Sequence, residues 1–369
     1  MNRFFSNTGF FVAVVLCLVA CSPRLQLVGI DNPEVPVASV AEATKHSVFI
    51  ITTREDSDVV GALFSELRAD ELGFASVEVS VPPTHEIGNI EHPKSLPPDP
   101  RTEFAIVDPT VYGAEAAFVS ALNSELRSLP PHKREVLFFV HGYNTSTSDA
   151  ILLLGQFVED SGFQGVPILF TWASAAKVTR YVYDLNSALA ARPMLLKAAD
   201  VVSKSIADDF FVFAHSMGTF LTMEAIVSAS QSGRFNRSGR LQGVVLASPD
   251  IDVDVFRSQL AQVDLRGERF FVLLSEDDAA LRASRIVAGG VDRVGNASAE
   301  VIGSLGVTAI DLSEVSDSQS GSHSKFTGSP EIVQLIGNGL NRAGNLVTRP
   351  QTILDEVLGE LPVSVVFGN

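Results

Sequence analysis

After Tyr112, short apolar runs alternate with longer segments in which apolar residues recur at helical spacing. The runs predicted as strands are Glu135–Val140, Val166–Phe170, Phe210–Ala214, Leu241–Ala247, Phe270–Ser275 and Val307–Leu312. The segments predicted as helices are Tyr112–Leu129, Asp149–Gly162, Asn186–Ala207, Thr219–Ser230, Val253–Val263 and Ala279–Ala288. Continuous apolar strands that alternate with helices predict an α/β fold, in which helices cover both faces of a mostly parallel sheet.

The part before this alternation has a different pattern. Ser47–Thr53 and Ala75–Val81 are β-rich and flank the segment Leu63–Leu72, in which charges are mixed and no element is assigned. The Pro-dense stretch Pro82–Pro100 cannot be a helix or a central strand, so we expect it to cross the surface in an extended form. The predicted divisions are a β-rich N-terminal extension (45–111), a catalytic core (112–345) and a C-terminal segment (346–369).

The first residues are typical of a secretory signal. The apolar run Gly9–Ala20 is too short to span a bilayer and reads as a signal-peptide core, so residues 1–20 are predicted to be removed. Leu18-Val19-Ala20-Cys21 resembles a bacterial lipoprotein box, which implies acyl chains on Cys21 and a stable membrane anchor. An ordinary signal peptide with a chance cysteine is the alternative. Ser22 resembles lipoproteins sorted to an outer membrane, facing the periplasm, and residues 21–44 are predicted to be a flexible tether.

Composition narrows the class of partner. The 369 residues carry a formal net charge of −16, and no basic cluster could follow a phosphate backbone, which argues against nucleic-acid binding. Cys17 lies within the predicted signal and Cys21 at its end, so the mature body would have no disulfide. Its stability must then come from the packing of the core.

Ala214-His215-Ser216-Met217-Gly218 predicts the catalytic nucleophile. An apolar strand stops at a small residue, Ser216 follows two positions later, and a helical segment resumes at once. Strand, tight turn and helix with small residues on both sides of a serine are the context of a nucleophile elbow. The alternative is a serine that caps an ordinary helix.

A serine hydroxyl needs a base and an acid that orients this base. Only His323 lies downstream of Ser216, in a small-residue loop beyond the last predicted strand, and it is the predicted base. For the acid, the tip after Phe270–Leu274 favours Asp277 or Asp278, with Asp250 after the preceding strand as a rival. Asp278 also immediately precedes a helix, where a carboxylate can act as a cap.

Two backbone N–H groups are predicted to form an oxyanion hole. One belongs to Met217, just after the nucleophile, and the other to Tyr143 in the loop after Glu135–Val140. Gly142 allows this loop to approach closely, and His141 beneath it is interpreted as structural.

Six motifs follow one another in a fixed order: Val-His-Gly-Tyr-Asn (140–144), Phe-Thr-Trp (170–172), Ala-His-Ser-Met-Gly (214–218), Ser-Pro-Asp-Ile-Asp (248–252), Ser-x-x-Asp-x-Ala-Leu (275–281) and Gly-Ser-His-Ser (321–324). Together they resemble a bacterial α/β-hydrolase family of unknown function that is esterase- or lipase-like. The resemblance covers most of residues 45–328, implies an α/β-hydrolase fold and aligns Asp278 with the acid position. Ala173 replaces a common proline and Ala214 replaces the first glycine of the elbow.

These features predict a serine hydrolase that cleaves carboxylic esters, either small molecules or lipids, without a cofactor or metal. Trp172, the only tryptophan, lines the substrate pocket or packs in the core, and Tyr181 and Tyr183 are further pocket candidates. An acyltransferase that uses the same triad is the first alternative. A catalytically silent lipoprotein that binds envelope partners is the second.

Overall fold

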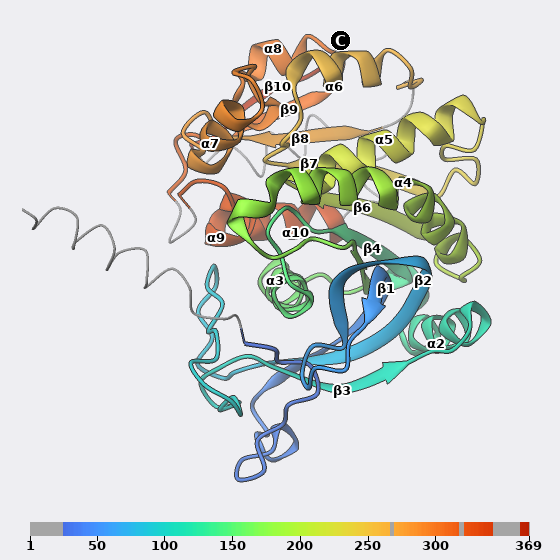
Figure 1. The fold of residues 1–369 in the computed structure, drawn as a ribbon, viewed down its shortest axis with the longest axis vertical. Helices are drawn as coiled ribbons and strands as arrows, with labels where there is room; N and C mark the ends of the chain where they lie inside the picture. The colour runs from blue at the N-terminus through green and yellow to red at the C-terminus, as the bar shows by residue number, and fades with distance from the viewer. Residues whose placement is uncertain (1–24, 266–268, 317–320, 342–361, 369) are drawn as a thin grey trace, which may run out of the picture.

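The computed structural model describes residues 25–265, 269–316, 321–341 and 362–368. The predicted signal peptide and Cys21 lie outside this range. The described strands form one ten-stranded sheet in the order β10-β9-β8-β7-β6-β4-β5-β1-β2-β3 (Figure 1). Their bounds are β1 (Thr44–Asp56), β2 (Phe64–Val81), β3 (Ala105–Val111), β4 (Glu135–Val140), β5 (Val166–Thr171), β6 (Asp209–His215), β7 (Leu241–Ala247), β8 (Phe270–Leu274), β9 (Thr308–Asp311) and β10 (Ser364–Val366).

The run β9-β8-β7-β6-β4-β5-β1 in this order is parallel throughout. At the two edges, β2, β3 and β10 pair antiparallel with their neighbours. The helices are α2 (Glu115–Ser128), α3 (Thr147–Ser161), α4 (Tyr181–Ser203), α5 (Met217–Gln231), α6 (Val253–Leu260), α7 (Ala279–Val287), α8 (Ala299–Gly303), α9 (Lys325–Gly328) and α10 (Pro330–Asn341). The predicted mostly parallel sheet, covered on both faces and preceded by a β-rich extension, is confirmed.

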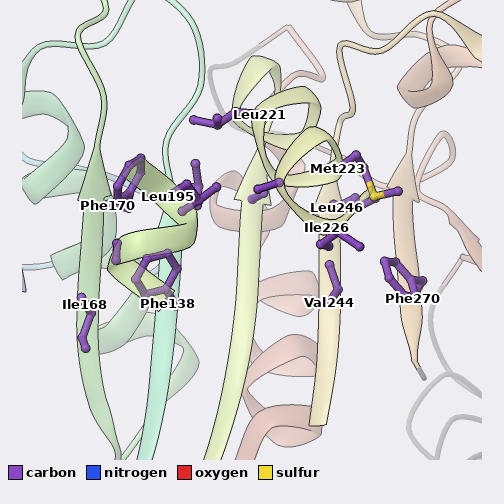
Figure 2. Packing of buried hydrophobic residues seen from close by; sticks show 14 of the residues in the cluster. Phe138, Ile168, Phe170, Leu195, Leu221, Met223, Ile226, Val244, Leu246 and Phe270 are labelled. Carbon is purple, nitrogen blue, oxygen red and sulfur yellow. The ribbon is translucent and has the colours of Figure 1, made fainter. Parts of the chain in front are cut away.

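The sheet separates two apolar layers. Helices α2, α4, α5 and α6 pack on one face, and α3, α9 and α10 pack on the other. Figure 2 shows the first layer, where Phe138 of β4 and Val244 of β7 lie beneath Leu195 of α4 and Ile226 of α5. Such packing makes the strands continuously apolar, which is why the alternation along the sequence was informative.

The N-terminal part differs from the prediction of a tether. Leu27 and Val28 are buried, and the N–H of Val28 donates to Gly61 O at 2.8 Å. The isolated pairing of Val28 with Ile106 places this segment against the sheet edge. The prediction of a flexible tether over 21–44 is therefore wrong from Leu25 onward, because apolar side chains in this segment are buried on the body.

Parallel strands bring their carboxyl ends to one edge of the sheet, and this edge carries the candidate site. The loops after β4, β6, β7 and β8 hold the predicted oxyanion loop, nucleophile and acids. The crevice outside the carboxyl ends of such strands is the usual place for ligands in open α/β sheets.

Candidate active site

Ser216 occupies a sharp turn between β6 and α5. Its φ of 52° and ψ of −125° lie outside the regions that a serine usually adopts. The turn is fixed because the Ser216 N–H donates to Ala247 O at 2.9 Å and its carbonyl accepts from the Thr219 N–H at 3.0 Å. Ala214 is fully buried and paired with Val140 and Leu246, and its methyl packs in the apolar layer on one face of the sheet. Strand, strained serine and helix form the local geometry of a nucleophile elbow.

Two glycines let neighbouring backbone approach this turn. A Cβ on Gly142 would lie 2.8 Å from Ser216 Cβ and 3.1 Å from His215 Nδ1. A Cβ on Gly218 would lie 2.4 Å from His141 O. The contacts of 2.8 and 2.4 Å are shorter than real Cβ atoms make, so the close approach of the loop after β4 to the elbow requires glycine at both positions.

His323 and Asp278 form a hydrogen-bonded pair. His323 Nδ1 lies 2.8 Å from Asp278 Oδ2, and the carboxylate is fully buried. The other oxygen, Oδ1, accepts from the Leu281 N–H at 2.9 Å and caps α7. One oxygen of Asp278 therefore makes the contact expected of the acid, and the other makes the contact expected of a helix cap.

The contact between nucleophile and base stays a prediction. Among the described residues, no hydrogen bond joins Ser216 Oγ to the His323 ring, whose side-chain partner is Asp278. Hydrogen bonds of this kind are often long in a free enzyme and shorten when substrate binds.

His215 connects the nucleophile elbow with the loop of His323, and no pattern along the chain singles it out. Its Nε2 lies 3.2 Å from the His323 carbonyl oxygen, so this nitrogen carries the proton and donates it. The rings of His215 and His323 are 4.8 Å apart, and Phe326 lies 4.9 Å from His215 on another side. Burial, followed by the nearby His323 ring, holds the pKa of His215 well below its usual value. A neutral His215 therefore holds the loop of the predicted base against the elbow.

The two rival acids are engaged elsewhere. Asp277 accepts from Lys325 Nζ at 3.0 Å and from Ser322 Oγ at 2.7 Å. Asp250 accepts from Ser284 Oγ at 2.5 Å and lies 3.2 Å from Arg293 Nε. Neither carboxylate bonds to the His323 ring, so the geometry favours Asp278 as the partner of this histidine.

The predicted oxyanion donors belong to the two segments that meet where Gly142 approaches Ser216. Met217 is the first residue of α5 and Tyr143 follows Gly142. In the described part of the chain, neither backbone N–H has a hydrogen-bond partner. Both donors thus remain available for a developing negative charge.

His141 and Trp172 support this loop from below. Both are fully buried and their rings stack at 5.1 Å. His141 Nδ1 donates to Gly142 O at 2.8 Å, and Trp172 Nε1 donates to His141 O at 2.9 Å. Burial, aided by the charge of Arg54, lowers the pKa of His141 to about 3, so the ring is neutral. Trp172 is fully buried and packs in the core, as its alternative interpretation expects.

Asp184 anchors the rest of the loop. This buried carboxylate accepts from the Asn144 N–H at 3.0 Å, Ser174 Oγ at 2.6 Å and the Ala175 N–H at 2.7 Å. Arg54 of β1 donates to Thr145 O at 2.8 Å from the other side. Burial lowers the pKa of Arg54 to about 10, and Asp184 partly opposes this shift. The Asp184 carboxylate of α4 and the Arg54 guanidinium of β1 thus fix the oxyanion loop.

The tyrosines divide into two groups. Tyr181 Oη donates to Asp250 Oδ2 at 3.0 Å, and Asp250 in turn donates its N–H to Ser216 O at 3.3 Å. Tyr143 packs edge-on against Tyr181 at 5.3 Å. Tyr183 instead contacts the β1–β2 hairpin, where Arg68 lies 4.5 Å above its ring. Tyr181 is therefore near the elbow, whereas Tyr183 is a structural contact.

A cavity of about 480 Å³ lies between α4, α5 and the sheet, lined by Phe138, Val212, Ile226 and Phe235 among other residues. No predicted site residue lines it. In the ranges that the structure describes, no group of three or more potential ligand side chains is arranged to hold a metal ion. No described helix is long and apolar enough to cross a bilayer.

The doubly covered parallel sheet with a strained serine after its central strand β6 defines the class of α/β hydrolases. The chain belongs to one family of this class, the alpha/beta hydrolases of unknown function (DUF900), whose family model matches residues 114–339. The resemblance found in the six sequence motifs is thereby confirmed. No curated protein matches the chain.

Solved structures similar to this chain include esterases. One is an esterase from Rhizomucor miehei, with 13% identity, a TM-score of 0.37, and coverage of 95% of this chain and 100% of that one. Another is an esterase from Pyrobaculum calidifontis, with 12% identity, a TM-score of 0.35, and coverage of 57% and 77%. A third is a thermostable esterase from Pseudomonas putida, with 12% identity, a TM-score of 0.32, and coverage of 91% and 88%.

Proposed function

We propose that this protein hydrolyses carboxylic esters through an acyl-enzyme formed on Ser216. The observation that carries the proposal is the strained Ser216 at the end of β6, beside a histidine loop that is already paired with a buried carboxylate. A helix-capping serine needs neither the positive φ nor a neighbouring His–Asp pair. The nucleophile elbow of an α/β hydrolase has both.

The chemistry follows from the roles of these groups. Ser216 Oγ attacks the ester carbon while His323 Nε2 takes its proton, and the N–H groups of Met217 and Tyr143 hold the resulting oxyanion. The intermediate collapses, the bond to the leaving oxygen breaks, and His323 returns the proton to this alcohol. Water then attacks the acyl carbon with His323 again as base, which releases the acid and restores Ser216. Throughout, Asp278 fixes the tautomer of the neutral His323 ring and stabilises the imidazolium when this ring is protonated.

The test is covalent labelling with a fluorescent fluorophosphonate, which reacts with activated serines. The full chain should be labelled, and Ser216→Ala should abolish the signal while Ser322→Ala, a serine of the base loop, should keep it. Labelling that persists in Ser216→Ala would contradict the assignment of the nucleophile. Turnover of a short-chain ester by the unlabelled protein, measured with and without an added alcohol, distinguishes hydrolysis from transfer to this alcohol.

We further propose that Cys21 carries a lipid anchor that places the protein at the outer membrane. The support is the small-residue sequence before this cysteine. Expressed in a bacterium with Cys21→Ser, the protein should be released from the membrane fraction by a high-salt wash, whereas the parent and Cys17→Ser should stay in it. A Cys21→Ser protein that stays in the salt-washed membrane fraction would exclude the lipid as the anchor.

A further inference from the structure

Two short segments beside the candidate site expose aliphatic side chains. Val178 and Val182 lie at the start of α4, and Ile286 and Val287 lie at the end of α7, with exposed fractions between 63% and 79%. Neighbouring aliphatic side chains at such exposure leave apolar surface in water, which often marks an interaction site. We call the segments 177–182 and 282–287 together the edge face.

The two segments are joined to each other and to the elbow. Tyr181 Oη lies 3.0 Å from Ser284 Oγ, so the start of α4 contacts α7 directly. Both are found at the same end of the sheet (Figure 1). Tyr181 also donates to Asp250, whose N–H donates to Ser216 O. The edge face therefore borders the candidate catalytic serine.

The charge of the edge face is opposite to that of the chain. Its twelve residues, Lys-Val-Thr-Arg-Tyr-Val and Arg-Ala-Ser-Arg-Ile-Val, contain no acidic residue, in a chain with 43 acidic and 27 basic residues. The four basic side chains, Lys177, Arg180, Arg282 and Arg285, are exposed. Arg285 pairs with Asp292 at 3.0 Å on the flank. Exposed aliphatic residues among basic ones fit a surface with an apolar interior and anionic headgroups.

The start of the described chain lies at the same edge of the sheet. The Leu27 N–H donates to Ser148 Oγ at 3.1 Å, and Ser148 is the second residue of α3, which begins directly after the oxyanion loop. Cys21 precedes the first described residue, Leu25, by only four positions in the sequence. A lipid on Cys21 would thus enter a bilayer close to the edge that carries the edge face.

We propose that the edge face docks on a lipid bilayer that contains anionic headgroups. Val178, Val182, Ile286 and Val287 insert at the boundary of headgroups and acyl chains, and the four basic side chains contact lipid phosphates. The docking stands on exposure, charge and position alone. The substrate class that follows, an ester carried by a lipid of this bilayer, rests on the proposed function.

The test is cosedimentation with vesicles, with the chain from Ser22 onward, so that neither the predicted signal sequence nor a covalent lipid contributes. The vesicles are phosphatidylcholine with or without phosphatidylglycerol. Replacing Lys177→Gln and Arg180→Gln should lower the partition coefficient on phosphatidylglycerol vesicles roughly ten- to thirty-fold, with a smaller loss at high salt. Replacing Val182→Ser and Ile286→Ser should lower binding to both kinds of vesicle.

The matched control is Ile206→Ser with Val301→Ser. These aliphatic residues are also exposed, but they precede β6 and β9 and so lie at the opposite edge of the sheet. The control should bind as its parent does. A parent that does not sediment with anionic vesicles, or edge-face variants that bind unchanged, would overturn the proposal. Self-association of the parent without vesicles that the edge-face variants lose would assign this face to a second copy of the chain.

Fluorophosphonate labelling and turnover of a soluble short-chain ester separate the two proposals. Both signals should be equal in the parent and in the edge-face variants, because these side chains do not contact the candidate catalytic groups. Vesicle binding without labelling of Ser216 would overturn the proposed function and leave the docking intact. Labelling of Ser216 without vesicle binding would overturn the docking and leave the proposed function intact.

Discussion

His141 Nδ1 donates a hydrogen bond of 2.8 Å to the carbonyl oxygen of Gly142. The peptide unit that follows Gly142 is planar, and in the trans form its C=O and the N–H of Tyr143 point in opposite directions. A histidine that holds the oxygen below the loop therefore aims the Tyr143 N–H away from itself. This N–H is the predicted second oxyanion donor, so His141 is a positioning residue and not a catalyst.

Replacing His141→Phe should lower kcat about ten- to a hundred-fold, because it releases the peptide that presents the oxyanion donor. Phe keeps the stacking on Trp172 but removes the donor. KM for a soluble ester should change little, since ground-state binding does not depend on this N–H. His141→Asn places an amide nitrogen near the position of Nδ1 and should recover much of the lost kcat. An equal loss in both variants would mean that His141 acts only through stability.

His215 should position the predicted base through the His323 carbonyl. His215→Phe removes the donated hydrogen bond, which frees the base loop, and we expect the rate of fluorophosphonate labelling to fall about tenfold. His215→Gln retains a donor close to Nε2 and should label at nearly the parent rate. The thermal unfolding midpoint of both variants separates this effect from general instability. Equal labelling of parent and Phe variant would refute the role.

Asp278→Asn should lower kcat by roughly three to four orders of magnitude. The asparagine oxygen can still accept from the Leu281 N–H, so α7 keeps its cap and stability should change little. The NH2 group of this asparagine, however, donates to His323 Nδ1. The proton of the neutral ring then lies on Nε2, which can no longer act as the base. The pair of measurements, kcat and the free energy of unfolding, tests both roles of one carboxylate.

Asp277→Asn is the matched comparison for this prediction. Asp277 is the adjacent carboxylate, but it binds Lys325 and Ser322 and not the His323 ring. Its replacement should reduce kcat far less than Asp278→Asn. A dead Asp277→Asn beside an active Asp278→Asn would move the acid to position 277.

The sequence predicted the apolar strands and the elbow well because both depend on local pattern. Phe210–Ala214 was expected as a strand and β6 spans Asp209–His215. Less regular elements were missed. The first half of β2, from Phe64, is exposed and charged as part of a long hairpin arm, so no apolar period marks it. The start of α4 was placed at Asn186, although the helix begins at Tyr181.

The partners of the residues that support the site could not be predicted, for a different reason. Asp184 and Asn144 are 40 positions apart, and His215 and His323 are 108 apart. No spacing along a chain reveals such pairs, because only the packing of α4 and of the base loop brings them together. The predicted nucleophile and acid follow strands β6 and β8, and the predicted base lies in a loop of small residues. Such local patterns can be recognised in the sequence. Their function stays a prediction until it is measured.

A partly buried ionic cluster joins the Pro-dense stretch Pro82–Pro100, called the belt, to α3, and it predicts a pH dependence of stability. His85 Nδ1 lies 2.8 Å from Glu91 Oε2 within the belt, and Nε2 lies 2.7 Å from Asp160 Oδ1 on α3. Asp160 also accepts from the N–H of Gly88 and from Gln156. Burial lowers the pKa of His85, but the hydrogen bonds to Asp160 and Glu91 outweigh it and raise this pKa to about 9.

A folded pKa above the unfolded value of about 6.5 means that the folded state holds the proton more tightly. The stabilisation is therefore complete below pH 6.5 and is lost as the pH rises through 9. Because the histidine is partly solvated, we expect a contribution of about 1–2 kcal/mol. Urea unfolding of the parent and His85→Gln should differ by this amount at pH 6 and converge near pH 10. His92→Gln, an exposed histidine of the same belt, should follow the parent at both values. A difference between parent and His85→Gln that stays constant with pH would show that His85 is held by packing against Phe104 and not by its charge.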